Sequence, residues 1–302
     1  MANLFSGRSL VMGESYLSFH TTNTNTRPAQ FYDNWNLALL EITYQDIAEV
    51  IVGVENSHYI WFVGGSNFKF NEDGAAIGGT LTGLAVYDYY PATSSYAGAR
   101  FILENFKVPL KSFGSASDTE TTDDDDALWS RILAGADTIN LSDESDVFSG
   151  RAGNDVINGN YGGDYLLGGE GSDTLSGGEG DDWLVGENGI DILAGGLGND
   201  VFAFDARAGK KNNDTITDFE HSVDSLFFNT SVFTSLGGGQ LAEDQFVLGK
   251  KPLDANDYFL YSNGTLFYDA DGSGKGKSLA VVTLTGVPEL THTDIFSGGG
   301  WV

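Results

Sequence analysis

The sequence predicts an all-β chain built around a central stack of short strands, with a small β-rich (α+β) domain before it and a β cap after it. Three observations predict this class: an Asp recurs every nine residues over 132–203, a large apolar residue stands two positions after each Asp, and glycines recur between these residues from Gly150 onward. The recurring Asp residues are Asp137, Asp146, Asp155, Asp164, Asp173, Asp182, Asp191 and Asp200.

Each nine-residue repeat predicts one tight turn and one short strand. The six residues Gly-Gly-x-Gly-x-Asp favour a turn, because glycine adopts left-handed backbone angles at little cost. The next three residues are expected to form a strand whose central apolar side chain points inward. One repeat cannot bury that side chain alone, so repeats must stack, two to a coil, with coils about 4.8 Å apart. Asp residues eighteen positions apart then lie above one another.

Stacked carboxylates repel one another, and 132–203 holds fourteen acidic residues against one basic residue, Arg151. Oxygen ligands from carboxylates and turn carbonyls suit calcium better than magnesium, which demands stricter octahedral geometry. We therefore expect calcium between stacked turns, held by Asp155 with Asp173, Asp164 with Asp182, Asp173 with Asp191, and Asp182 with Asp200. Weaker sites are expected for Asp137 with Asp155 and Asp146 with Asp164, whose turns have lost most glycines.

The glycines of these turns are part of the expected metal sites. A flexible Gly/Asp-rich linker is the alternative interpretation, but a linker does not keep an apolar residue in phase with an Asp. The glycines are Gly150, Gly153, Gly159, Gly162, Gly168, Gly169, Gly171, Gly177, Gly178, Gly180, Gly186, Gly189, Gly195, Gly196 and Gly198.

The repeat resembles that of the RTX (hemolysin-type calcium-binding repeat) proteins, most clearly in GGEGSDTLS (168–176) and GGLGNDVFA (195–203). Six consecutive units run from Gly150 to Ala203, and Arg151, Asn160 and Glu187 depart from the pattern at its second glycine. The resemblance implies a right-handed parallel β-roll that binds calcium. It also implies export by a type I secretion transporter that reads an uncleaved C-terminal signal, and a secreted or cell-surface location.

Composition narrows the function further. The chain has 302 residues, a net charge of −28 and no cysteine. This charge excludes a nucleic-acid binder on electrostatic grounds. No window approaches 18 apolar residues, so no membrane span is expected, and the first residues lack the features of a Sec signal peptide. Bound calcium would then replace disulfides as the stabilising cross-link.

Residues 1–115 are interpreted as a β-rich domain that binds a surface polysaccharide, protein or other ligand, followed by an acidic linker over 116–131. Alternation predicts strands at 58–63, 67–70, 80–90 and 100–110, and either a helix or two strands over 33–50. The domain is also loosely similar to haem-scavenging hemophores. Haem binding would need Tyr87, Tyr89, His58 or His20, whereas ordinary packing explains the same tyrosines.

Residues 204–302 are expected to form the cap and to hold the secretion signal. The stretch 213–228 resembles the flank of serralysin-type rolls, with Ile216, Phe219, Leu226 and Phe228 facing the open end. Asp214 and Asp218 either complete a last calcium site or are ordinary turn acids. Residues 258–268 predict a hairpin with Asn263-Gly264 at its turn. The loop 269–274 resembles one common in RTX flanks and is either a calcium loop or a plain turn.

No catalytic motif is recognisable in the sequence. There is no HExxH, the four histidines stand apart from one another, and Gly64-Gly65-Ser66-Asn67-Phe68 breaks GxSxG at its last position. We therefore expect a calcium-binding, non-enzymatic protein. The alternative is an enzyme of unrecognised type, acting on polysaccharide, within residues 1–115.

Overall fold

The computed structural model describes residues 133–273 and 275–299, and before them the backbone of strands over 5–6, 9–10, 31–33, 46–54, 57–70, 76–90 and 95–109. The described residues divide into two compact units, 1–142 and 143–302. All described elements are strands except for two short 3-10 helices, η1 (Glu243–Gln245) and η2 (His292–Asp294). The predicted all-β class is confirmed.

The first unit contains an antiparallel sheet of six strands in chain order. The strands are β3 (Phe31–Asp33), β4 (Asp46–Val54), β5 (Ser57–Phe70), β6 (Ala76–Tyr90), β7 (Ser95–Pro109) and β8 (Thr138–Asn140), and each pairs with the next. A separate two-residue pair joins β1 (Phe5–Ser6) to β2 (Ser9–Leu10). The strands expected at 58–63, 67–70 and 80–90 fall within β5 and β6, with the first two merged into one strand, and the strand expected at 100–110 corresponds to the second part of β7.

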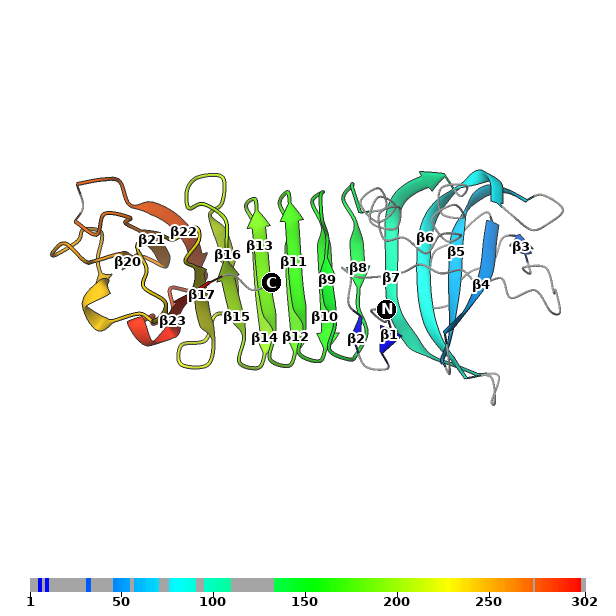
Figure 1. The fold of residues 1–302 in the computed structure, drawn as a ribbon, viewed down its shortest axis with the longest axis horizontal. Coiled ribbons are helices and arrows are strands. Elements are labelled where there is room, and N and C mark those ends of the chain that lie inside the picture. Colours follow the sequence, from blue (N-terminus) through cyan, green and yellow to red (C-terminus); the bar gives the residue numbers. More distant parts are fainter. Residues whose placement is uncertain are drawn as a thin grey trace. The chain divides into compact units, whose positions relative to one another are not determined.

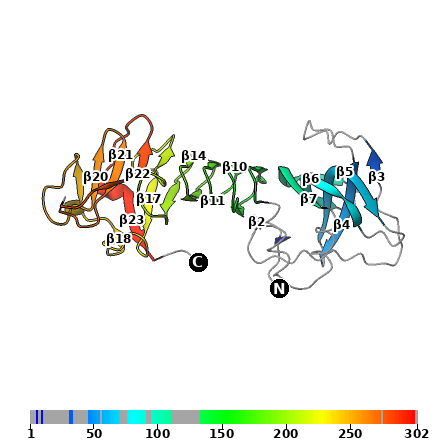
Figure 2. The same cartoon turned by 90° about the horizontal axis from the view of Figure 1, so that it is seen from above.

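The second unit begins with a roll of parallel strands that alternate between two sheets (Figure 1). Figure 2, seen from above, shows β10 and β14 in one layer and β11 in the other. One layer holds β10 (Val156–Tyr161), β12 (Thr174–Glu179), β14 (Ile192–Leu197) and β16 (Asp214–Ile216). The other holds β9 (Val147–Ser149), β11 (Tyr165–Glu170), β13 (Trp183–Asn188), β15 (Val201–Phe204) and β17 (Ser225–Asn229).

The register of the roll is set by the nine-residue period. Leu175 pairs with Ile157 and with Leu193, and Leu184 pairs with Leu166 and with Phe202. The apolar residue of every repeat is fully buried, and each such side chain contributes about 1.5–3 kcal/mol. These core residues are Phe148, Ile157, Leu166, Leu175, Leu184, Leu193 and Phe202.

The predicted three-residue strands are too short. Complete strands of the roll have six residues, as in β12 and β13, because the first turn residues still pair with the coils on either side. Gly178, for example, pairs with Asn160 and with Gly196. The true turn is therefore confined to the three residues that end in the Asp.

The cap closes the last coil with aromatic side chains. Strands β22 (Leu279–Leu284) and β23 (Ile295–Gly298) extend the two layers in parallel, and β18 (Gly239–Gln240), β19 (Phe246–Leu248), β20 (Phe259–Ser262) and β21 (Thr265–Tyr268) complete them. Phe228 lies at the centre, with ring centroids 5.0 Å from Phe204, 5.0 Å from Phe233 and 4.5 Å from Phe259.

Two sequence predictions for the cap are confirmed. The four residues expected to face the open end are buried: Ile216, Phe219, Leu226 and Phe228. β20 and β21 form the expected antiparallel hairpin, with Asn263 and Gly264 at φ 52° and 80° in its turn. Positive φ at both central residues is the backbone that a two-residue hairpin turn requires.

Candidate metal centre

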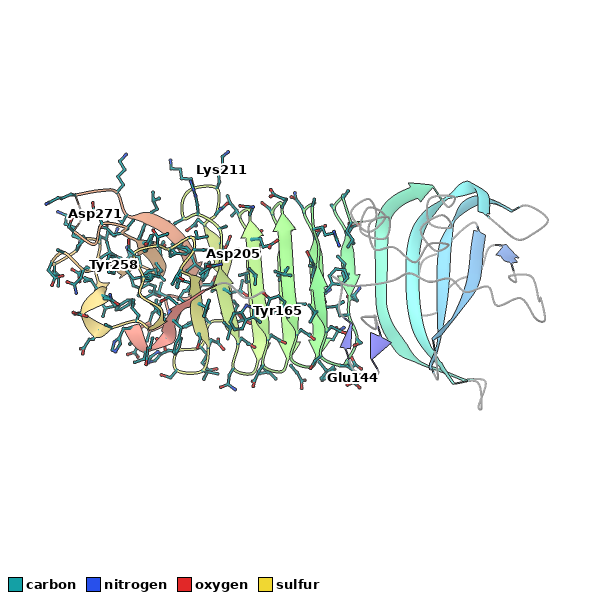
Figure 3. The ribbon with its side chains drawn as sticks, in the orientation of Figure 1. Glu144, Tyr165, Asp205, Lys211, Tyr258 and Asp271 are labelled. Atoms are coloured by element: carbon teal, nitrogen blue, oxygen red, sulfur yellow. The ribbon has the colours of Figure 1, made fainter. Side chains whose placement is uncertain are left out.

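The recurring Asp residues form two ladders along the edges of the roll. In five of the repeats, the backbone N–H of the Asp donates to Oδ1 of the Asp eighteen residues later, at 2.8 Å for Asp146 to Asp164, Asp155 to Asp173, Asp164 to Asp182 and Asp173 to Asp191. The same contact from Asp182 to Asp200 is 3.0 Å. The turn before Asp146, which lacks glycine and carries Glu144 at its edge (Figure 3), keeps this geometry.

The second carboxylate oxygen in this ladder has no hydrogen-bond partner. It is buried in each of Asp164, Asp173, Asp182, Asp191 and Asp200. Leaving a buried acceptor unsatisfied costs about 1–3 kcal/mol, and more when the group is charged. These five oxygens, three on one ladder and two on the other, therefore mark positions where a cation would remove a large penalty.

The first glycine of each repeat leaves open the space that these oxygens face. A Cβ atom at Gly168 would lie 2.5 Å from Asp173 Oδ2 and 2.8 Å from the carbonyl oxygen of Gly186. Gly150, Gly159 and Gly177 stand in the same relation to their own Asp and to the matching carbonyl of the next coil. A carboxylate and a carbonyl from successive coils thus converge where only glycine fits, which is the donor set that calcium prefers.

The fourth residue of each repeat brings a further carbonyl to the gap between coils. A side chain at Gly171, Gly180 or Gly189 would collide with the carbonyl oxygen of Gly153, Gly162 or Gly171 respectively. The second position is equally close: Gly169, Gly178 and Gly196 face the carbonyls of Arg151, Asn160 and Gly178. The predicted glycines therefore bring carbonyl oxygens together, and they do so because coils stack without side chains between them.

The three departures from the repeat keep the glycine-like backbone. Arg151, Asn160 and Glu187 have φ of 68°, 79° and 64°. Left-handed angles cost a residue with a Cβ roughly 1–2 kcal/mol. The surrounding ladder therefore imposes the turn even where the local sequence does not favour it.

Burial and mutual repulsion shift the acidity of the ladder. Burial raises the pKa of Asp164 to about 7, against the backbone N–H of Asp146, which lowers it, and with added repulsion from Asp182. Burial likewise raises the pKa of Asp182 and of Asp200 to about 6. In the folded roll without metal, these carboxyl groups therefore hold protons more readily than unfolded Asp residues do, and the roll carries less negative charge than the sequence count gives.

Both ladders continue into the cap after insertions. The N–H of Asp191 donates to Asp214 Oδ1 at 3.1 Å, 23 residues on, and the N–H of Asp200 donates to Asp224 Oδ1 at 3.1 Å, 24 residues on. Burial, then repulsion from Asp191, raises the pKa of Asp214. Asp214 thus continues the ladder as the partner of Asp191, and its role in a last calcium site stays a prediction.

Asp224 was missed in the sequence because an insertion breaks the nine-residue spacing. The signal that survives is the Asp-x-apolar triplet, present as Asp224-Ser225-Leu226. Its two oxygens accept from the N–H groups of Asp200 and Glu220, so it ends the ladder. Asp218, the other acid proposed for a last site, accepts from the N–H groups of Gly195 and Gly196, at 3.1 and 3.0 Å. Asp218 and Asp224 therefore both accept hydrogen bonds from backbone N–H groups.

Two other predicted sites differ from the repeat turns. Asp137 is buried but lies in the first unit, so its pairing with Asp155 stays a prediction. Asp271 lies at the outer edge of the cap (Figure 3), where its carboxylate accepts from Ser273 and from the Gly276 N–H. These bonds hold the pKa of Asp271 below its usual range, and they favour the plain turn.

Among the described residues, no three acidic or histidine side chains lie close enough together to hold a metal ion by themselves. The Asp residues contribute one carboxylate per turn, and backbone carbonyls must supply the remaining oxygens. His58, Tyr87 and Tyr89, named for haem, have no described side chains, and His20 lies outside the described residues. In the described part, no helix is long and apolar enough to cross a membrane.

The nine-residue repeat also matches a known family model. Residues 133–166, 142–175 and 167–202 match the family model of the RTX calcium-binding nonapeptide repeat (4 copies). No curated protein sequence matches the chain. Among solved structures, the solution structure of the AlgE6R3 subunit of the Azotobacter vinelandii mannuronan C5-epimerase is 23% identical, over 54% of this chain and 78% of that one, with a TM-score of 0.28.

Proposed function

We propose that this chain, whose residues 133–202 are RTX calcium-binding nonapeptide repeats, is an exported protein whose roll folds when it meets calcium outside the cell. The observation that carries the proposal is the row of buried, unpartnered Oδ2 atoms on Asp164, Asp173, Asp182, Asp191 and Asp200. Calcium, when bound, supplies a positive charge that compensates these unpartnered carboxylate oxygens. The Asp carboxylates and the turn carbonyls of 150–200 would hold it.

Calcium concentration acts as the folding signal in this proposal. With a net charge of −28, the chain repels itself where calcium is scarce. Extracellular calcium sites bind with Kd on the order of 10⁻⁴–10⁻³ M, so the roll would load outside the cell and stay empty inside it. Because each coil buries its neighbour's apolar residue, loading one site favours the next.

Export and partner binding complete the proposal. Residues 204–302 would hold the signal for a type I secretion transporter, with a serralysin-like flank, and folding outside the cell would draw the chain outward. The domain before the roll would be the working end that binds a surface polysaccharide or protein. The alternative hypotheses for that domain are an enzyme acting on polysaccharide and a haem-binding module.

The direct test follows far-UV circular dichroism while calcium is added to the chelated full chain. We expect a cooperative gain of β signal by about 10 mM calcium, above the affinity range of such sites. Magnesium at the same concentration is the matched control and should give little gain, because it demands octahedral geometry and keeps its waters. An unchanged spectrum with calcium removes the proposal.

A further inference from the structure

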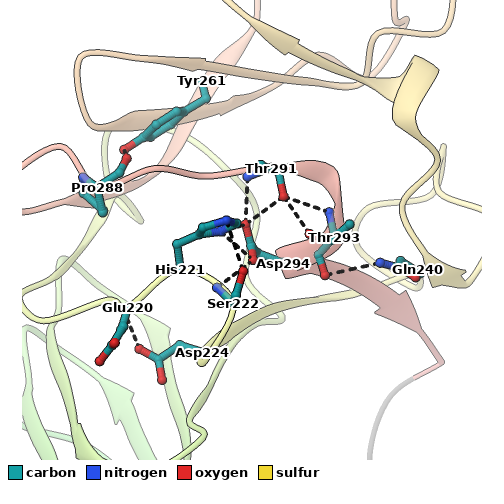
Figure 4. Close-up of polar contacts among 10 residues, drawn as sticks. All are labelled: Glu220, His221, Ser222, Asp224, Gln240, Tyr261, Pro288, Thr291, Thr293 and Asp294. Atoms are coloured by element: carbon teal, nitrogen blue, oxygen red, sulfur yellow. Dashed lines mark hydrogen bonds and ion pairs between the residues drawn. The ribbon is translucent and has the colours of Figure 1, made fainter.

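The cap brings together a serine, a histidine and an aspartate from two distant segments (Figure 4). His221 Nδ1 lies 2.8 Å from Asp294 Oδ2 and 3.0 Å from Oδ1, and His221 Nε2 lies 3.1 Å from Ser222 Oγ. His221 and Ser222 follow β16, whereas Asp294 is the last residue of η2. Neither the repeats nor the calcium sites account for this arrangement.

Asp294 is held as an acceptor that orients the imidazole. It is 2% exposed and also accepts from the N–H of Thr291 at 2.7 Å, the Thr291 hydroxyl at 3.1 Å and the N–H of Ser222 at 3.2 Å. With these donors around it, the carboxylate also accepts from the ring, which fixes the proton on His221 Nδ1. His221 Nε2 is then the acceptor for the Ser222 hydroxyl.

Ser222 is exposed and has a strained backbone. Its φ of 65° is uncommon for a residue with a side chain, and such strain also occurs at the nucleophile of hydrolases. His221 is 27% exposed, so solvent reaches the base as well as the nucleophile. A buried acid, an oriented histidine and an exposed serine in hydrogen-bond contact are the parts of an acyl-transfer relay, which is recognised by geometry and not by order in the sequence.

We propose that Ser222, His221 and Asp294 form a hydrolytic site for carboxylic esters on the surface of the cap. The Ser222 Oγ–H proton passes to His221 Nε2 as Oγ forms a bond to the ester carbonyl carbon. The carbon–oxygen bond to the alcohol breaks, and the alcohol takes the proton from Nε2. Water then adds to the acyl-serine carbonyl, gives a proton to Nε2, and releases the carboxylic acid as Oγ regains its proton.

Because Ser222 is exposed, the site is open to substrates in solution. A serine at the surface meets esters that approach from solvent, whether as small molecules or as acyl groups carried on a polymer. The site supplies a base and a nucleophile, so esters with a good leaving group, such as aryl esters, are the substrates it is best able to cleave. Asp294 is a positioning residue, because its carboxylate bonds His221 Nδ1, the Ser222 N–H and Thr291, and acts on the Ser222 hydroxyl through the imidazole.

A fluorophosphonate probe tests the proposal on the calcium-loaded full chain. We expect one adduct per chain, mapped by peptide mass spectrometry to Ser222, and release of p-nitrophenol from p-nitrophenyl acetate that depends on the same residue. Ser222→Ala should abolish both. Ser231→Ala, which removes another cap hydroxyl bonded only within its own turn, is the matched control and should change neither.

His221→Gln and Asp294→Asn separate catalysis from structure. Each keeps a polar side chain of similar size, and circular dichroism reports whether the cap stays folded. We expect each to slow labelling of Ser222 by about 100-fold or more, the scale of general-base assistance. If Asp294→Asn does not fold, the labelling rate of His221→Gln compared with the parent chain still tests the proposal. No adduct at Ser222, or equal labelling rates in folded His221→Gln and the parent, would overturn the proposal.

Discussion

The backbone N–H of Asp173 donates to Oδ1 of Asp191 at 2.8 Å, so each recurring acid caps the turn of the coil before it. This contact uses one carboxylate oxygen and leaves Asp191 Oδ2 buried without a partner. One oxygen thus fixes the spacing of the coils and the other is available to a cation. The two roles can be separated by substitution.

Asp182→Asn should uncouple calcium binding from the coil contact. The Asn oxygen can still accept from the Asp164 N–H, but the charge at the unpartnered oxygen is lost. We expect the calcium concentration at half-maximal folding to rise about tenfold or more, since even outer-shell changes at metal sites cost 10–100-fold. Circular dichroism measures this midpoint.

Asp181→Asn is the matched control for that substitution. Asp181 is the preceding residue, is exposed, and bonds only Asn199 in the next coil. Its replacement removes the same formal charge, so a midpoint that moves equally in both variants would assign the effect to overall charge and contradict a role for the buried oxygen.

Gly168→Ala should destabilise the calcium-loaded roll. The added Cβ would approach Asp173 Oδ2 to 2.5 Å and the Gly186 carbonyl to 2.8 Å, so both oxygens must move. Overpacking of this kind costs about 1–3 kcal/mol. Gly237→Ala, where a Cβ meets nothing within 4 Å, is the control. Urea unfolding in saturating calcium compares them, and equal midpoints would show that the glycine space is unused.

Acid should partly replace calcium in the metal-free chain. The folded state raises the pKa of Asp164 to about 7 and of Asp182 to about 6, above the value of about 3.9 for an unfolded Asp. Between these values the folded chain binds more protons than the unfolded chain, so folding becomes less favourable as pH rises from about 4 to about 7. The chain freed of calcium should therefore gain β signal as pH falls toward 5.

The same linkage gives the opposite trend for calcium. Because protons and calcium compete for the carboxylates, the calcium midpoint should rise as pH falls over this range. Titrations at pH 5, 6 and 7.5 measure it. A midpoint independent of pH would mean that the buried acids are not the ligands.

Phe228→Ala should unfold the cap before the roll. Phe228 is fully buried between Phe204, Phe233 and Phe259, and removing such a ring costs about 3–5 kcal/mol. Leu253→Ala, at a side chain that is 83% exposed, should stay within about 0.5 kcal/mol. Thermal unfolding of the calcium-loaded chains reports both, and similar losses would place the cap core elsewhere.

By itself the sequence determined the roll, its register and its buried acids, because the strict nine-residue period sets which residues stack from coil to coil. Only the tertiary structure shows which residues pair where that period is interrupted. Because the insertions after Ala203 interrupt the nine-residue spacing, Asp224 could not be recognised from the sequence as the end of its ladder. Pairing between coils extends the strands to six residues, whereas turn chemistry predicts three. Asp294 meets His221 across 73 residues, because strand pairing in the cap, and not local spacing, brings β17 beside β23.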